Sequence, residues 1–369
     1  MVQKTFKTTL TNTADGLLDT KQFMDDMEAH LDELDNELGE DERLNRKHPL
    51  KRLHNSLFGN FFTPSNMSGY MDCPAGAIWN SLAPKKDYLS TGSVYHEIME
   101  KLVNHTNGDW NKFSDLSEDD IATIKSDVYT EFDRNGERYH KDDVELALKR
   151  SLTIGDDGYP NAIGYLKTDN TLPDSSITEV FIKMSTEELM NTIPFLQTMD
   201  KNPTIFHTMI GVLDRIDLSA GNCGNIIIDY KTGKSMSQRS IDGYIPQMVV
   251  YKWLAAAEFD IPFSTVFLFS PQLTSGPKYF LMDTSISSQV AVWEKICNYS
   301  KSLSKAREEN LFSYEGTNKY TGRGTANPHF PFPTGEKETF EIEMNYDWNQ
   351  ENDTPVTHIH TTINGKEVR

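Results

Sequence analysis

Three charged side chains on two neighbouring stretches of the chain could carry out chemistry together. Asp214 belongs to the first stretch, and Asp229 and Lys231 belong to a second one that begins with three isoleucines. Both stretches are typical of β-strands, and the turn 219–225 would join them. Because side chains alternate along a strand, Asp229 and Lys231 share one face while Tyr230 points away. Two carboxylates beside an ammonium group predict a divalent-cation site next to a charge-stabilising lysine.

The alternative to such a site is an exposed hairpin held by salt bridges, with Lys231 in a structural ion pair. The run Ile226-Ile-Ile argues against exposure, because a continuous apolar strand is typical of the buried centre of a sheet. Asp217 lies three residues after Asp214, so it should point to the other face of the first strand. We therefore interpret Asp217 as structural.

The two strands resemble the active-site hairpin of the PD-(D/E)xK nucleases, specifically that of their RecB-like branch. Upstream, Gly92-Ser-Val-Tyr-His96 resembles the Gly-x-x-x-His helix of that branch. Downstream, Gln247-Met-Val-Val-Tyr251 resembles its Gln-x-x-x-Tyr helix. All four pieces follow the order of the family, and the resemblance covers roughly residues 60–300. It implies an α/β fold of the restriction-endonuclease type, with a mixed central sheet flanked by helices and a helical N-terminal part.

The resemblance also implies a set of metal ligands. Asp214 and Asp229 would hold Mg²⁺ or Mn²⁺ with the imidazole of His96 and the backbone carbonyl of Tyr230, since hard cations prefer oxygen ligands and neutral imidazole is a common further ligand. Glu179 lies on the strand before the hairpin, where related nucleases often carry a glutamate. Whether Glu179 supports the metal is left open. The alternative for His96 is an ordinary surface or core histidine.

The catalytic residues implied by the resemblance are Asp214, Asp229, Lys231, Gln247 and Tyr251. The lysine would polarise the attacking water and stabilise the transition state. The glutamine would orient the lysine or the water, and the tyrosine would contact a phosphate. Gln247 and Tyr251 are four residues apart and hence on one helix face. Their alternative role is a polar pair beside a core stripe.

No iron–sulfur cluster is expected, although some members of the branch carry one. Residues 66–82 resemble the segment that opens such domains, a helix followed by Cys-Pro, and Cys73 would be one of four cluster ligands. After the Gln-x-x-x-Tyr helix only Cys297 remains, and four thiolates cannot be assembled. Cys73 is therefore interpreted as a small buried residue.

The composition is that of a soluble globular protein. The chain has 369 residues, 37% of them hydrophobic, which is enough for a substantial core. No stretch approaches the ~20 apolar residues that span a bilayer, so no membrane association is expected. The first residues lack the apolar core of a signal peptide. Three widely spaced cysteines predict no disulfide framework, which favours a cytoplasmic location.

The net charge of −19 is at first sight unfavourable for binding DNA, because phosphate contacts need Lys and Arg. The charge is uneven, however, since residues 1–45 carry twelve acids against four Lys and Arg, a net of −8. Basic residues gather at 46–52, at Lys149 and Arg150, and at Lys231, Lys234 and Arg239. A local positive groove is compatible with this pattern.

The elements that must position these residues follow from hydrophobic periodicity. Helices are expected over 20–44, 91–105, 243–258 and 286–308, with a largely helical region over 110–155, and strands over 177–184, 207–218, 225–232, 264–270 and 278–283. The domain boundaries that follow are an acidic helical N-terminal extension over 1–60, a RecB-like nuclease domain over 61–312 and an irregular tail over 313–369. The acidic helix over 20–44 could cover the core, pair with a partner or mimic nucleic acid.

These observations predict a metal-dependent DNA nuclease that hydrolyses phosphodiesters with a metal-activated water. By analogy with the family, it would be an exonuclease of phage or bacterial recombination or repair. Its partners would be single- or double-stranded DNA and a protein of recombination or replication. Two alternatives remain: a non-catalytic DNA- or protein-binding module of a larger assembly, and a structure-specific or defence endonuclease.

Overall fold

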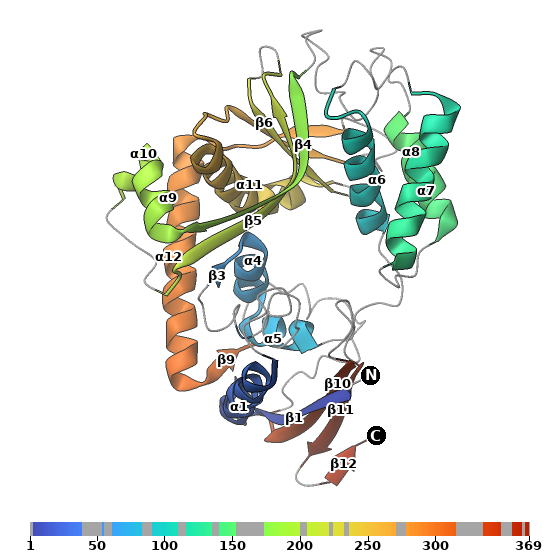
Figure 1. Cartoon of the computed structure of the whole chain (residues 1–369). Coiled ribbons are helices and arrows are strands. Elements are labelled where there is room, and N and C mark those ends of the chain that lie inside the picture. The colour runs from blue at the N-terminus through green and yellow to red at the C-terminus, as the bar shows by residue number, and fades with distance from the viewer. Residues whose placement is uncertain are drawn as a thin grey trace. The chain divides into compact units, whose positions relative to one another are not determined.

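The computed structural model describes most of the chain. The described residues are 3–38, 54, 61–82, 91–109, 116–134, 140–152, 173–199, 205–220, 224–231, 236–270, 278–314, 335–347, 356–363 and 366–368. The chain forms two compact units (Figure 1). Unit 1 comprises Met1–Lys85, Lys201–Thr208 and Lys295–Arg369, and unit 2 comprises Lys86–Asp200 and Met209–Glu294.

Unit 2 is built on a mixed β-sheet. Its strands are β4 (Ser175–Ser185), β5 (Thr208–Leu218), β6 (Ile226–Tyr230), β7 (Thr265–Phe269) and β8 (Tyr279–Leu281). The strands β4, β5, β6, β7 and β8 pair in this order. Strands β5 and β6 are antiparallel, β6 and β7 are parallel, and β7 and β8 are antiparallel. The mixed central sheet predicted from the sequence is thus confirmed.

Helices cover both faces of this sheet (Figure 1). The helices of unit 2 are α6 (Thr91–His105), α7 (Glu118–Arg134), α8 (Lys141–Leu152), α9 (Thr186–Thr192), α10 (Pro194–Gln197), α11 (Gln238–Phe259) and residues 286–294 of α12 (Ile286–Glu309). Apolar side chains of α6, α7 and α8 form one core with Ile226, Ile228 and Tyr230 of β6. Helix α11 packs against the opposite face. Both faces of β6 are therefore buried, as its isoleucine run indicated.

A glycine permits the close approach of α11 to β5. A Cβ at Gly211 would lie 2.9 Å from Leu254 Cδ1 and 3.1 Å from the ring of Tyr251. Helix α11 begins at Gln238, five residues earlier than predicted, because the Ser237 side chain accepts a hydrogen bond from Ser240 N and caps the helix. This cap and this close approach fix the helix that carries Gln247 and Tyr251.

Unit 1 contains a six-stranded antiparallel sheet. Its strands are β1 (Gln3–Asn12), β2 (Leu17–Asp19), β9 (Leu311–Ser313), β10 (Glu338–Asp347), β11 (Val356–Ile363) and β12 (Lys366–Val368), in the order β12-β11-β10-β1-β2-β9. Strand β1 pairs with β10 from Gln3 opposite Asp347 to Asn12 opposite Glu338. Unit 1 also contains β3 (Phe61–Phe62), α1 (Lys21–Leu38), α4 (Pro64–Asp72) and α5 (Pro74–Leu82).

The region predicted to be an irregular C-terminal tail contains the strands β10, β11 and β12, and the predicted helical N-terminal part contains β1 and β2 in addition to its helix. Strand β1 pairs with β10 although the two lie at opposite ends of the chain, and local sequence periodicity does not reveal a pairing of that kind. In the acidic helix α1, Phe23 and Met27 are fully buried, and the Phe6 ring of β1 meets the Phe23 ring edge to face at 6.1 Å. The interpretation in which α1 covers a core is thus confirmed for its described residues. Residues 39–44 of the predicted helix lie outside the description.

A buried chain of hydrogen bonds joins the two ends of the chain within unit 1. Trp79 Nε1 donates to the Tyr314 hydroxyl at 2.8 Å, and this hydroxyl donates to Asn12 Oδ1 at 2.6 Å. Asn12 Nδ2 in turn donates to Glu338 Oε2 at 3.0 Å. Because buried polar groups are costly when unpaired, this chain fixes the arrangement of α5, β1 and β10.

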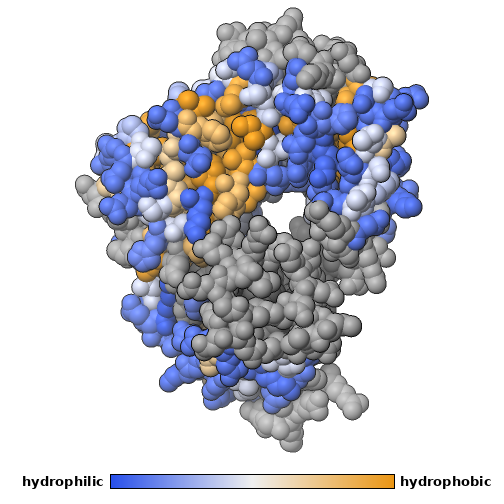
Figure 2. Space-filling view, in the orientation of Figure 1, coloured by the Kyte–Doolittle hydropathy of each residue, from blue (hydrophilic) through white to orange (hydrophobic). Residues whose placement is uncertain are grey.

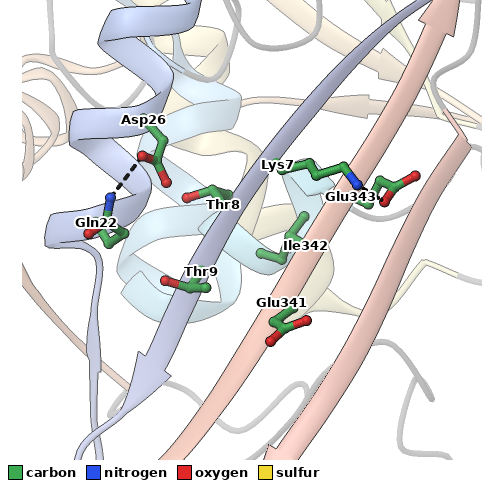
Figure 3. A pocket seen from close by; sticks show the side chains of 8 residues that line it. All are labelled: Lys7, Thr8, Thr9, Gln22, Asp26, Glu341, Ile342 and Glu343. Atoms are coloured by element: carbon green, nitrogen blue, oxygen red, sulfur yellow. Dashed lines mark hydrogen bonds and ion pairs between the residues drawn. The ribbon is translucent and has the colours of Figure 1, made fainter.

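A groove of about 500 Å³ lies between α1 and the strands β1 and β10 (Figure 3). It is lined by Lys7, Thr8, Thr9, Gln22, Asp26, Glu341, Ile342 and Glu343. Two of its contacts are an ion pair, in which Lys7 Nζ lies 2.8 Å from Glu343 Oε2, and a hydrogen bond that Gln22 Nε2 donates to Asp26 Oδ1 at 2.8 Å. It brings together no set of chemically reactive side chains. Among the described helices, none is long and apolar enough to cross a membrane.

Candidate active site

The hairpin of β5 and β6 places Asp214 and Asp229 opposite one another. The register pairs Arg215 with Ile228, so the next pair toward the site is Asp214 and Asp229. Directly opposed residues share a face of the sheet, as predicted. The carboxylate of Asp214 also accepts a hydrogen bond from Tyr230 N at 2.5 Å, which holds the acid against the end of β6.

His96 and Glu179 reach the same point from α6 and β4. His96 Nδ1 lies 3.4 Å from Asp214 Oδ1 and 3.8 Å from Glu179 Oε1. One ligand atom from each of the three side chains lies within 4.8 Å of the others. We call His96, Glu179 and Asp214 the cation cluster. The role of Glu179, which the sequence left open, is supported by this position.

Glu179 has an unusual backbone conformation. Its φ is +50°, in the left-handed region that side chains other than glycine rarely adopt. Such strain is of order 1–3 kcal/mol and persists where the surrounding structure enforces it, often at functional sites. It occurs in β4 at the residue that joins the cation cluster.

A second set of side chains surrounds Lys231. Its ammonium forms an ion pair with Asp229 Oδ2 and lies 3.5 Å from Gln247 Oε1. Gln247 Nε2 lies 3.1 Å from Asp229 Oδ1 and 2.9 Å from the Tyr251 hydroxyl. We call Asp229, Lys231, Gln247 and Tyr251 the lysine group. The structure thus brings together the five residues predicted to be catalytic.

The pKa values of four charged groups in the two sets are all raised from their usual range. Burial, followed by the charge of Asp229, raises the pKa of Asp214 well above its usual range. Burial likewise raises the pKa of Asp229, although Lys231 opposes this shift. Burial lowers the pKa of Lys231, but the charge of Asp229 and their hydrogen bond outweigh it, so the pKa is raised and the ammonium stays charged. Burial also lowers the pKa of His96, but Glu179 and Asp214 raise it by more.

The donor set fits a divalent cation. The cluster offers carboxylate oxygens and one imidazole nitrogen, and these are the ligand types that Mg²⁺ and Mn²⁺ accept. Asp214 and Asp229 are almost fully buried, at 7% and 1% exposed, with one lysine beside them. Buried carboxylates without a matching positive charge are costly. A dication would remove that cost.

The residues interpreted as structural have that role. Asp217 Oδ1 accepts from Arg215 Nε at 2.8 Å, and Asp217 Oδ2 accepts from Arg215 Nη2 at 2.7 Å. Ser176 Oγ donates to the same acid at 2.5 Å. The Tyr230 side chain points into the core with α6, as alternation predicted. Its backbone carbonyl stays a predicted ligand. Cys73 is buried, at 5% exposed.

One residue near the site was missed by sequence reasoning. The Tyr244 ring lies with its centroid 4.6 Å from Lys231 Nζ. Tyr244 precedes Gln247 by three residues on α11, so helical spacing could have placed it on the same face. Of the predicted basic residues, Lys234 and 46–52 lie outside the described residues.

The chain was also compared with known proteins. A sequence profile of the PD-(D/E)XK nuclease superfamily matches residues 62–337. No curated protein sequence matches the chain. Among solved structures, one named "Putative exonuclease" from Eubacterium rectale is 11% identical, covers 71% of this chain and 86% of its own, and has a TM-score of 0.39. SSO0001 is 16% identical, covers 69% and 83%, and has a TM-score of 0.25. The profile covers most of the chain, including the cation cluster and the lysine group, and the protein belongs to the PD-(D/E)XK nuclease superfamily.

Proposed function

We propose that this protein is an Mg²⁺- or Mn²⁺-dependent DNA nuclease of the RecB-like branch, acting as an exonuclease in phage or bacterial recombination or repair. The observation that carries the proposal is the meeting of the cation cluster and the lysine group at the end of β6. Membership of a nuclease superfamily supplies the reaction, hydrolysis of a phosphodiester. The branch and the exonuclease mode come from the resemblance of the Gly-x-x-x-His and Gln-x-x-x-Tyr segments.

In this proposal, His96, Glu179 and Asp214 hold the divalent cation, with Asp229 and the Tyr230 carbonyl as further ligands. When bound, the cation supplies positive charge to the substrate phosphate and lowers the pKa of water. Asp229 has a second task in the protein itself, because its Oδ2 pairs with Lys231 and its Oδ1 lies within hydrogen-bond distance of Gln247 Nε2. One carboxylate therefore joins the two sets.

Lys231 would place a fixed positive charge where negative charge develops on the phosphate. The ammonium stays protonated because Asp229 raises its pKa, so it acts as a charge and a hydrogen-bond donor. Gln247 would orient the side chains of Lys231 and Asp229, since its carbonyl oxygen faces Lys231 and its amide nitrogen faces Asp229 and Tyr251. Tyr251, linked to Gln247, would contact a phosphate of the strand.

Exposed apolar side chains lie on the strands that carry Glu179 and Asp214. On the visible face of the molecule, hydrophobic residues gather over β4 and β5 (Figure 2). Phe181 and Val212 on these strands are 50% and 41% exposed. Because every nucleobase has an apolar face that stacks on aromatic rings, this surface suits contacts to bases beside the reacting phosphate.

The test is a cleavage assay with end-labelled single- and double-stranded DNA, in linear and circular forms. Linear DNA should be cleaved in Mg²⁺ or Mn²⁺ and left intact in EDTA. Release of labelled mononucleotides or short products from ends, with circles resistant, would support the exonuclease. Cleavage of circles would support the endonuclease alternative instead.

A matched pair of variants controls this assay. Asp229→Asn should abolish cleavage, whereas Asp242→Asn, which changes an exposed acid on α11, should leave it intact. DNA binding without any cleavage in either metal would contradict the nuclease and support a non-catalytic binding module.

A further inference from the structure

The Tyr244 ring is in contact with the lysine of the proposed nuclease site. The ring centroid lies 4.6 Å from Lys231 Nζ, within the range in which an ammonium is attracted to the face of an aromatic ring. We propose that Tyr244 is a positioning residue, whose ring holds the Lys231 ammonium in the direction needed for phosphodiester hydrolysis. The inference rests on the proposed function.

The position of Tyr244 on α11 supports this role. Residues 244, 247 and 251 recur at helical spacing and so lie on one face of the helix. Two of them form the polar part of the lysine group, because Gln247 lies between Lys231 and Tyr251. Tyr244 adds an aromatic contact to the same ammonium one turn earlier. A single helix face thus supplies an oxygen and a ring to Lys231.

Lysine needs such a restraint more than most residues do. Its side chain has four rotatable carbon bonds and a compact charge with no preferred plane, so its direction must come from its surroundings. The ion pair with Asp229 and the contact with Gln247 leave room for rotation, since the charge of Asp214 also attracts the ammonium. The Tyr244 ring, in contact with the ammonium, limits that rotation.

The ring itself, and not the hydroxyl, makes the contact. Among the described residues no hydrogen bond of the Tyr244 hydroxyl is found, and the side chain is half-buried at the edge of the site. Phenylalanine would keep the ring face, whereas leucine would keep apolar bulk and remove the ring. These two substitutions therefore separate a ring contact from a hydroxyl contact and from simple packing.

The first experiment measures kcat and KM for cleavage of end-labelled linear DNA in Mg²⁺. Tyr244→Leu should lower kcat about tenfold with KM within twofold of wild type. Tyr244→Phe should restore most of the lost kcat. In a Lys231→Met background, Tyr244→Leu should have no further effect on the residual rate, because the residue acts through the lysine.

The second experiment needs neither metal nor activity. The metal-free proteins are treated with an amine-reactive acetylating reagent, and modification of Lys231 is followed by mass spectrometry relative to the exposed Lys301. Lys231 should react several-fold faster in Tyr244→Leu than in wild type, and at the wild-type rate in Tyr244→Phe.

Several results would overturn the inference. A Tyr244→Leu variant with wild-type kcat, or with unchanged Lys231 labelling, would show that the ring does not hold the lysine. A Phe variant as slow as the Leu variant would assign the effect to the hydroxyl, and a change confined to KM would indicate a substrate contact. If wild-type protein cleaves no DNA in Mg²⁺ or Mn²⁺, the proposed function fails and this inference fails with it. If wild type cleaves and the Leu variant is equally active, only this inference fails.

Discussion

The two faces of the β5–β6 hairpin handle buried charge in different ways. On one face, Asp217 and Arg215 are both fully buried and neutralise each other through two short hydrogen bonds. On the other, Asp214 and Asp229 are buried with Lys231, and Glu179 adds a third acid. On the first face, the buried positive and negative charges balance each other. The second holds three carboxyl groups beside Lys231 and His96, and this excess of acids marks the place where a cation is expected to bind.

The largest effect is expected on the unbalanced face. Asp229→Asn or Lys231→Met should lower the cleavage rate by at least about 10³-fold, which corresponds to roughly 4 kcal/mol of activation free energy. Circular dichroism and thermal unfolding should show an intact fold, because these groups serve the site and not the core. A rate within about tenfold of wild type in either variant would contradict the catalytic assignment.

On the balanced face, the same kind of change should affect stability instead. Arg215→Met leaves Asp217 buried without its main counter-charge, and removing one partner of a buried pair costs about 3–5 kcal/mol. Urea unfolding at neutral pH measures this loss. Replacing Asp217 by Leu in the same protein should recover part of it. If Arg215→Met costs less than about 1 kcal/mol, the two faces do not differ as described.

A neutral residue at Asp214 should stabilise the metal-free protein. The folded-state pKa of Asp214 is raised, so its favourable contribution is present at low pH and is lost as pH rises above the unfolded value of about 4 toward the raised folded value. In EDTA, Asp214→Asn should therefore unfold at a higher temperature than wild type, and the difference should grow from pH 5 to pH 8. Mg²⁺ should raise the unfolding temperature of wild type by more than that of the variant. Equal responses to Mg²⁺ would argue against Asp214 as a ligand.

The smallest effects concern the frame that holds α11 beside the hairpin. Gly211→Ala would push a Cβ to 2.9 Å from Leu254, and overpacking of this kind costs about 1–3 kcal/mol. Gly243→Ala on α11 meets nothing within 4 Å and should stabilise the helix by about 0.5–1 kcal/mol. Urea unfolding should show that the free energy of unfolding falls in Gly211→Ala and rises in Gly243→Ala. If both substitutions raised the free energy of unfolding, β5 and α11 would not approach each other so closely.

The parts of this molecule that sequence could predict are the local ones. The alternation of side chains along a strand predicted that Asp229 and Lys231 share one face and that Asp217 lies on the other. Helical spacing predicted that Gln247 and Tyr251 lie on one helix face. In the unit 1 sheet, the pairing of β1 with β10 was missed because these strands lie at opposite ends of the chain. The place of Glu179 depends on a positive φ that no residue pattern reveals. Helical spacing could have identified Tyr244, but this residue belongs to neither the Gly-x-x-x-His nor the Gln-x-x-x-Tyr segment.

At Glu179, the backbone conformation that suits catalysis lowers the stability of the fold. Glycine and asparagine adopt a φ of +50° at little cost, whereas glutamate is held there against its own preference. Random variants selected only for survival of heat should therefore accumulate Gly or Asn at residue 179, each a gain in unfolding temperature. Selection for nuclease activity should restore glutamate at residue 179. A lineage that loses its need to cut DNA would be expected to lose this glutamate early, before the buried framework changes.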